Sequence, residues 1–152
     1  MKKLVLITMM SSLFSGCASV AMSDKVESDR AKEFAVPAEG HVGLYVFRKD
    51  TVGGAALKKD IRIDGKCLGE TAKGVFFFED LLGNRDVTIS TESEFSPNIL
   101  VLKLESGKNY FVNQYIKLGV FVGGADLKLE SEEEGKKQVS MLDMAVKGKC
   151  GK

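Results

Sequence analysis

Apolar residues along this chain alternate with polar ones over short stretches that turn-forming residues separate. The run at 42–48 is β-branched, aromatic and apolar throughout its centre, which is typical of a strand buried on both faces. The stretch 57–63 roughly alternates and ends at Asp64-Gly65, which favours a two-residue hairpin because both residues accept positive φ. Further strands are predicted at 66–70, 74–81, 86–90, 99–104, 110–118 and 120–129. This spacing predicts an all-β fold, an antiparallel β-sandwich of about 7–8 strands.

The pattern changes to helical spacing near the end of the chain. Ser131 stands three residues before Glu134, which is a capping box at a helix start, and apolar positions continue at helical spacing to Ala145. Gly135 weakens this prediction, because glycine inside a helix costs roughly 1 kcal/mol. Gly148 is the expected stop. We therefore expect one short C-terminal helix after the strands.

Three consecutive phenylalanines, Phe76, Phe77 and Phe78, do not fit a simple two-layer sandwich. Neighbouring strand residues point to opposite faces, so the three rings cannot share one core. Either the helix or the N-terminal segment covers the second face, or Phe77 contributes to an exposed patch of the kind that marks a binding surface. We favour coverage of the second face.

The first residues have the layout of a secretion signal. Lys2 and Lys3 are followed by a mostly apolar stretch over 4–14, which is shorter than the roughly 20 residues that span a bilayer. The stretch ends in Leu13-Phe14-Ser15-Gly16-Cys17, which resembles the lipobox of bacterial lipoproteins, although Phe14 stands where leucine is usual. We therefore expect a lipoprotein signal peptide over 1–16 and lipidation of Cys17.

Ordinary secretion is the alternative to this anchor. Small residues at Ser19 and Ala21 suit a standard signal peptidase, and cleavage after Ala21 would discard Cys17. If the lipobox is used, Ala18 follows the lipidated cysteine, where an aspartate would retain the protein at the inner membrane of enteric-type bacteria. We therefore expect an outer-membrane lipoprotein whose lipid-anchored domain faces the periplasm. Its first partner is the membrane itself, through the N-terminal lipid.

Composition agrees with one small domain behind a linker. The polar, aperiodic stretch 17–38 is expected to be the lipidated N-terminus and a flexible tether, and 39–147 to be the sandwich with its helix. The 22 basic and 21 acidic side chains nearly cancel, and removal of Lys2 and Lys3 leaves 20 against 21. A near-neutral chain with no basic patch argues against a nucleic-acid partner.

Two cysteines, Cys67 and Cys150, remain after Cys17. An even pair in an oxidising compartment predicts a disulfide, which would close a long loop and stabilise the fold by roughly 4–5 kcal/mol in the chain-entropy model. Two unpaired thiols, or a pair of metal ligands without further ligands, are the alternatives.

The run 63–89 resembles the PEGA-type modules of bacterial envelope proteins in its Asp-Gly hairpin, Gly-x-Thr motif and following strands. Gly83-Asn84 departs from the Pro-Gly turn that those modules prefer. Residues 40–142 more closely resemble an uncharacterised family of proteobacterial lipoproteins, a domain of unknown function. That likeness rests on the Asp-Gly hairpin and on the strand motifs at 43–48 and 107–114. It implies a transthyretin-like sandwich and an envelope address, and it implies no activity.

Catalytic chemistry is hard to assemble from this sequence. His41 is the single histidine, and no nucleophile motif accompanies it. The carboxylate pairs Glu92/Glu94 and Glu79/Asp80 are better explained by solvated positions than by a cleft. We expect no catalytic residues, no metal ligands and no cofactor. The expected function is a non-catalytic binding or structural module that contacts an envelope protein; a carrier of a small apolar molecule or lipid in a β cavity is the alternative.

Overall fold

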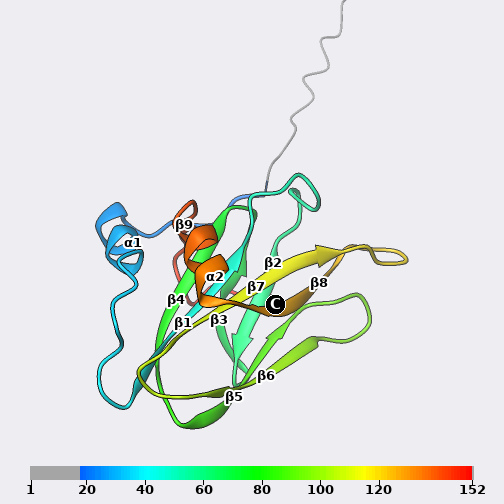
Figure 1. The fold of residues 1–152 in the computed structure, drawn as a ribbon. Helices are drawn as coiled ribbons and strands as arrows, with labels where there is room; N and C mark the ends of the chain where they lie inside the picture. The colour runs from blue at the N-terminus through cyan, green and yellow to red at the C-terminus, as the bar shows by residue number, and fades with distance from the viewer. Residues whose placement is uncertain (1–17, 152) are drawn as a thin grey trace, which may run out of the picture.

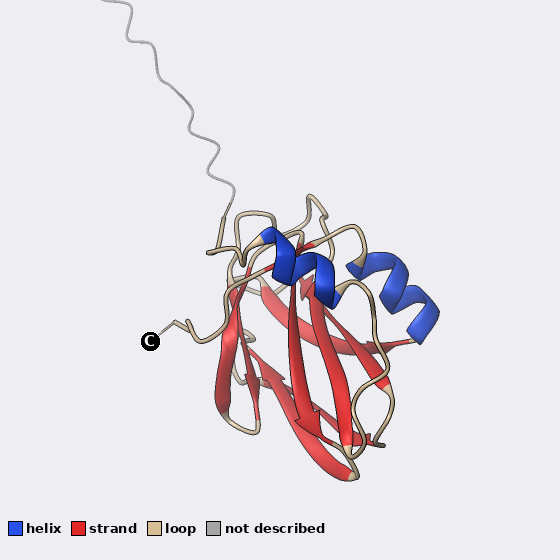
Figure 2. Ribbon diagram, turned by 90° about the vertical axis from the view of Figure 1, so that its left-hand side faces the viewer, coloured by secondary structure: helices blue, strands red, loops and turns tan. Residues whose placement is uncertain are grey.

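The computed structural model describes residues 18–151 (Figure 1). Two sheets pack face to face, and both helices lie on the outer face of one of them (Figure 2). The expected β-sandwich is thereby confirmed. The elements in chain order are α1 (Lys25–Ala31), β1 (His41–Arg48), β2 (Lys59–Ile63), β3 (Lys66–Thr71), β4 (Val75–Leu82), β5 (Arg85–Thr91), β6 (Asn98–Leu104), β7 (Asn109–Lys117), β8 (Gly124–Glu130), α2 (Glu132–Val139) and β9 (Asp143–Met144).

The two sheets differ in how their strands pair. The four-stranded sheet has the order β3-β2-β5-β6 and is antiparallel, whereas the five-stranded sheet has the order β8-β7-β1-β4-β9. In the five-stranded sheet β1 pairs with β7, and β4 with β9, in parallel. The expectation of a purely antiparallel sandwich was wrong here. The chain leaves this sheet after β4, makes β5 and β6 in the other sheet, and re-enters beside the start of β1.

Strand β1 is central and is buried on both faces. Its side chains alternate: Val42, Leu44 and Val46 point between the sheets, and Tyr45 and Phe47 point to the helix side. The inter-sheet core is completed by aliphatic side chains from both sheets and by Phe77. These buried side chains form one apolar cluster between the two sheets.

The second apolar layer lies between the five-stranded sheet and the helices. It contains residues from α1, α2 and the segment around β9, which together cover the sheet: Ala31, Tyr45, Phe47, Phe76, Phe111, Val139, Leu142 and Met144. Phe76 is fully buried there, and Phe78 packs against the same cluster. The structure therefore shows that the second face of the sheet is covered, as expected. Phe77 belongs to the inter-sheet core and does not face this second layer.

The turn between β2 and β3 has the predicted chemistry. Asp64 and Gly65 both have positive φ, 48° and 77°. Asn84, in the turn between β4 and β5, has a φ of 55°, a value that asparagine tolerates better than most residues. These turns fix the strand register that the alternating pattern requires.

The helices depart from the sequence-based expectation. Helix α2 begins as predicted, with the Ser131 side chain accepting a hydrogen bond from the Glu134 N–H, but it ends at Val139. The chain then forms β9 on the edge of the sheet. Helix α1 lies within the stretch 17–38 that was expected to be a flexible tether. It packs on the sheet with Ser28 and Ala31 buried, so an unattached linker was the wrong expectation for this part of the chain.

Candidate binding site

A pocket of about 570 Å³ lies between α1 and the five-stranded sheet. Its volume is within the usual range of small-molecule sites. Tyr45 from β1 and Phe78 from β4 reach it from the sheet, and α1 and the segment after β9 form its other walls. The lining residues are Ser23, Glu27, Arg30, Ala31, Ala35, Tyr45, Phe78, Met144, Ala145, Val146 and Lys147.

Local sequence explains why α1 forms beside this pocket. The Asp24 carboxylate accepts a hydrogen bond of 2.8 Å from the Glu27 N–H, which caps the first turn. Lys25 and Asp29 form an ion pair of 2.7 Å one turn apart. Such a short helix is marginal alone, so burial of Ala31 against the sheet must hold it in place.

Three hydrogen bonds fasten α1 and the preceding segment to the sheet and to β9. The Tyr45 hydroxyl donates to the carbonyl of Ala31 at 2.9 Å, and the Met144 N–H donates to the Ser28 hydroxyl at 3.2 Å. The Ser23 N–H donates to the carbonyl of Met144 at 2.8 Å. The apolar wall of the pocket is therefore built from segments at both ends of the chain.

Tyr45 is a structural residue of this site. Burial raises its pKa to about 12, so its phenolic proton is retained at neutral pH and its hydrogen bond to Ala31 persists. Its ring stacks on Phe111 with centroids 4.8 Å apart and packs against Phe78 at the same distance. The pocket thus has a rigid aromatic floor.

Charged side chains also line the pocket. Glu27 accepts a hydrogen bond from the Ser23 hydroxyl, and the Lys147 ammonium pairs with Glu79 at 2.7 Å. Arg30 forms no ion pair with any residue of the described chain. The arrangement suits a molecule with an apolar body and a polar or anionic end, since apolar lining supplies affinity and a few polar groups set orientation.

The residues that the sequence singled out for chemistry do not meet in one place. His41 lies 2.8 Å from Asp80 at the start of β1, whereas Glu79 pairs with Lys147. Glu92 and Glu94 do not face each other: the Glu92 carboxylate accepts a 3.4 Å hydrogen bond from the Asp60 N–H, and Glu94 binds the loop after β7. Between residues 18 and 151, no three metal-ligating side chains gather.

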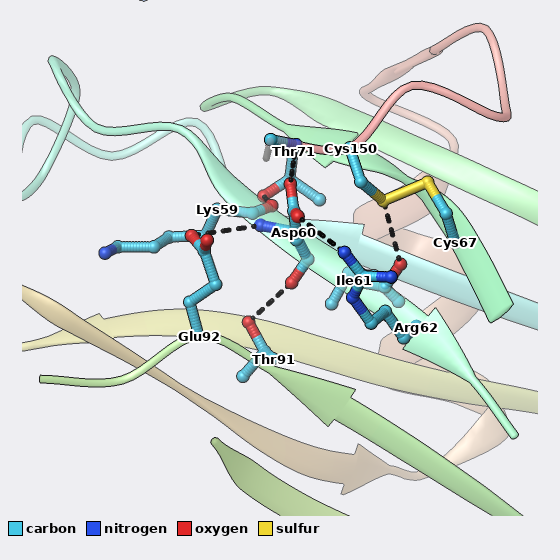
Figure 3. The surroundings of a disulfide bond; sticks show 10 residues. Lys59, Asp60, Ile61, Arg62, Cys67, Thr71, Thr91, Glu92 and Cys150 are labelled. Carbon is cyan, nitrogen blue, oxygen red and sulfur yellow. Dashed lines mark hydrogen bonds and ion pairs between the residues drawn. A yellow bond between two sulfur atoms is a disulfide. The ribbon is translucent and has the colours of Figure 1, made fainter. Parts of the chain in front are cut away.

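The structure joins Cys67 and Cys150 in a disulfide with their Cα atoms 6.0 Å apart (Figure 3). The bond attaches the last segment of the chain to the β2–β3 hairpin. Beside it, the Gly151 N–H donates to the buried Asp60 carboxylate at 3.0 Å, and the Gly148 N–H donates to the carbonyl of Leu68 at 2.8 Å. Cys17, the expected lipidation site, lies outside the described residues.

Sequence reasoning missed the pocket because it missed α1. The signal was present in the Asp24 cap, which stands three residues before Glu27, but the segment lacks the long apolar stripe that identifies a helix. The two walls also come from opposite ends of the chain, and no sequence pattern pairs 23–35 with 144–147. Neither helix described between residues 18 and 151 has the length and apolar character of a membrane span.

Comparison with known proteins identifies the family. Residues 38–125 match the model of a family described as protein of unknown function (DUF2846). The chain belongs to this DUF2846 family. It is also 54% identical over 134 residues to an uncharacterised protein of Haemophilus influenzae, covering 88% of this chain and 79% of that protein. No solved structure matches the chain. The matched DUF2846 region runs from just before β1 into the start of β8, so it spans most of the sandwich but not α1 or α2.

Proposed function

We propose that this chain is an outer-membrane lipoprotein, anchored through Cys17, whose periplasmic domain is a non-catalytic binding module. The observation that carries the proposal is the N-terminal sequence, with its basic start, its short apolar stretch and its lipobox-like end at Leu13–Cys17. Several acyl chains on one cysteine make release from a membrane negligible.

Two structural features support this address. The disulfide between Cys67 and Cys150 suits an oxidising compartment outside the cytoplasm. The Ala18 N–H donates to the carbonyl of Ala55 at 3.3 Å, and the Val146 N–H donates to the carbonyl of Ala21 at 2.8 Å. The residues that follow Cys17 are therefore attached to the domain, so a lipid on that cysteine would hold the domain close to the bilayer surface.

The anchor is tested by mass spectrometry of the mature protein purified from membranes. The expected N-terminus is a Cys17 carrying a diacylglycerol-sized mass increment, and the full chain with Cys17→Ser should lose both the increment and the membrane fraction. A mature chain that begins at Met22 would refute the anchor and indicate ordinary secretion.

The choice of membrane is tested with a second substitution. Ala18→Asp should move the acylated protein from the outer to the inner membrane in an enteric-type host, measured by sucrose-gradient separation of the two membranes. Ala18→Ser is the matched control and should leave the protein in the outer membrane. Equal distribution of all three proteins between the membranes would contradict an address set by the residue after the cysteine.

The pocket beside α1 favours a second candidate function, the binding of a small apolar or amphiphilic molecule. Tyr45, Phe78 and Met144 contribute apolar surface, and Glu27, Arg30 and Lys147 contribute charged groups to its lining. This site differs from the β cavity that the sequence suggested, because it lies outside the sandwich, under a helix. Its size and lining are those of ligand sites in other proteins.

Binding is tested with an environment-sensitive naphthylamine dye added to the purified chain. Ala35→Phe places a ring in the pocket and should weaken dye binding by roughly tenfold or more, as expected when a site of this volume is partly filled. Val36→Phe is the matched control, because Val36 is the next residue, is 83% exposed and does not line the pocket. Equal dye binding by all three proteins would remove the pocket as the site.

A further inference from the structure

The loop between β7 and β8 carries an unusual set of exposed apolar side chains. Phe121 is 83% exposed, and the other large apolar side chains of the loop are between 56% and 100% exposed. We call residues 118–122 the apolar tip; its exposed large side chains are Leu118, Val120, Phe121 and Val122. Phe95, on the loop before β6, is 78% exposed. A cluster of this kind indicates a surface that is covered in use.

The apolar tip is held in shape by one carboxylate. Glu94 accepts hydrogen bonds from the N–H groups of Val120, Phe121 and Val122, at 2.6 Å for the first and 3.3 Å for the last. Desolvation raises the pKa of the Glu94 carboxyl, but these three bonds outweigh it and leave the pKa below its ordinary value. The turn is also tight, since a Cβ on Gly119 would lie 1.8 Å from the carbonyl oxygen of Val122. The polar backbone groups are satisfied inward while the side chains point out.

The hairpin that carries the apolar tip packs, at its base, against the loop to which the start of the described chain is bonded. A Cβ on Gly123 would lie 2.6 Å from Leu57 Cδ1, and one on Gly54 would lie 2.6 Å from Ile116 Cγ1, so the loop 49–58 packs on the base of the β7–β8 hairpin. The same loop accepts the hydrogen bond from Ala18. Figure 1 shows the start of the described chain (blue) beside this loop at the top of the sandwich, and the yellow hairpin projecting to the right.

The loop 49–58, which contacts both Ala18 and the base of the β7–β8 hairpin, is held in place by Arg48. Arg48 is 3% exposed, and its guanidinium donates to the carbonyls of Leu57 at 2.7 Å and of Gly54 at 2.5 Å. Val52, on the outside of this loop, is 92% exposed and adds another apolar side chain to the same end. At the base of the hairpin, Lys117 and Asp126 form an ion pair of 3.1 Å, so these two charges compensate each other.

We infer that the apolar tip inserts into the interface of the lipid bilayer to which the chain is anchored. The inference rests on the proposed acylation of Cys17, which is covalently joined to Ala18 and therefore brings the bilayer surface to the loop 49–58. Exposed aromatic and aliphatic side chains next to an anchor gain free energy by entering the boundary between headgroups and acyl chains. The tip and the lipid thus form two contacts that fix the orientation of the domain on the membrane.

The experiment uses a single tryptophan in the full acylated chain, because the sequence has none. Phe121→Trp reports on the tip. Val36→Trp is the matched control, because Val36 and Phe121 are both 83% exposed and the segment 32–40 lies on the opposite side of the molecule (Figure 1). Each protein is reconstituted into vesicles of phosphatidylethanolamine and phosphatidylglycerol with or without brominated acyl chains.

Insertion predicts that the emission of the Phe121→Trp protein shifts to shorter wavelength and is quenched by brominated lipid roughly twofold or more, as for a ring at the acyl boundary. The emission of the Val36→Trp protein should not change. Adding Val120→Ser and Val122→Ser to the Phe121→Trp protein should reduce the quenching.

Equal quenching of both single variants, or of neither, overturns the inference. A shift in the Phe121→Trp protein without vesicles, together with a dimer in analytical ultracentrifugation, would assign the tip to a second copy of the chain and would also overturn it.

Failure of the anchor is distinguishable from failure of the tip. Mass spectrometry of the N-terminus decides acylation independently of fluorescence. If the N-terminus proves unacylated, the secreted Phe121→Trp protein is mixed with the same vesicles. Quenching there would support the tip as a lipid contact although the anchor is lost, and absence of quenching would reject both.

Discussion

Gly135 lies in α2 at the point where the helix touches the five-stranded sheet. A Cβ at this position would lie 2.1 Å from Cγ and 2.3 Å from Cβ of Phe111, a buried ring in the second apolar layer. The glycine that is unfavourable for helix formation is therefore what allows α2 to approach the sheet. Its cost in helix propensity is roughly 1 kcal/mol, less than the cost of forcing the two elements apart.

Gly135→Ala should destabilise the protein even though alanine is the better helix former. We expect the free energy of unfolding to fall by about 1–3 kcal/mol, because overpacking shifts α2 away from Phe111. Urea denaturation followed by circular dichroism measures this change. Gly53→Ala is the control, since a Cβ there meets no atom within 4 Å. A stabilised Gly135→Ala protein would contradict the close approach.

Glu94 links pH to the conformation of the apolar tip. Its pKa is below the ordinary 4.5 in the folded state, so its hydrogen bonds stabilise the tip at every pH above that value and are lost as the pH falls through the lowered pKa. In a titration followed by nuclear magnetic resonance, the amide signals of residues 120–122 should move with a midpoint below 4.5. Glu94→Gln should abolish this titration. A midpoint above 4.5 would show that the carboxylate does not hold the loop.

Single residues were predictable where local chemistry decides their conformation. Asp64 and Gly65 adopt positive φ because a two-residue hairpin requires it, and Ser131 caps its helix because the first N–H groups need an acceptor. Glu94 was not predictable in this way. Its partners lie 26 to 28 positions along the chain, so only the folded arrangement of two loops reveals its role.

At the scale of elements, the alternating pattern predicted the strands, whereas the sequence predicted neither α1 nor the end of α2. Each predicted strand has a counterpart, because alternation reports directly which side chains face a core. Helix α1 has seven residues and depends on contacts with Tyr45 and β9, and these are absent from its own sequence. Helix α2 ended early because the edge of β4 offered pairing partners to Asp143 and Met144.

Gln114 joins the two sheets through a buried polar contact. It is fully buried on β7, donates to the Thr91 hydroxyl of β5 at 2.7 Å, and accepts from the Thr71 hydroxyl of β3. The two hydroxyls also contact carbonyls of β2, so the network connects four strands. Such a buried polar network specifies how one sheet is placed on the other.

Gln114→Ala should lower the free energy of unfolding by about 2–4 kcal/mol, because it removes buried volume and two hydrogen bonds. Gln114→Met keeps the volume and should cost less, which separates packing from hydrogen bonding. Thermal and urea denaturation of both variants give the comparison. An Ala variant as stable as the wild type would mean that the sheets are positioned by the apolar core alone.

For the whole molecule, the sequence indicated a sandwich but not its assembly. The pairing of β1 with β7 and the pocket beside α1 both bring together segments far apart in the chain, and apolar periodicity has no information about partners. The N-terminal segment illustrates the same limit. Its polar composition suggested a tether, whereas backbone hydrogen bonds to Ala55, Met144 and Val146 attach it to the domain.

The C-terminal segment closes the edge of the sandwich between the two sheets. After β9 it leaves the five-stranded sheet, pairs Lys147 with Glu79 of β4, and reaches the four-stranded sheet, where Cys150 is bonded to Cys67. The disulfide therefore joins β3 to the C-terminal segment, over a sequence separation of 83. A crosslink over so long a loop restricts the unfolded chain strongly.

Removal of this crosslink should destabilise the whole domain. The double variant Cys67→Ala with Cys150→Ala is expected to lose roughly 4–5 kcal/mol of the free energy of unfolding if the chain-entropy term dominates. Urea denaturation of the oxidised wild type, the reduced wild type and the double variant measures the loss, and a thiol assay verifies the redox state. Reduction should affect the wild type and leave the double variant unchanged. A reduced wild type as stable as the oxidised one would show that the contacts of Gly148 and Gly151 hold the segment without the disulfide, because those backbone hydrogen bonds do not depend on either sulfur.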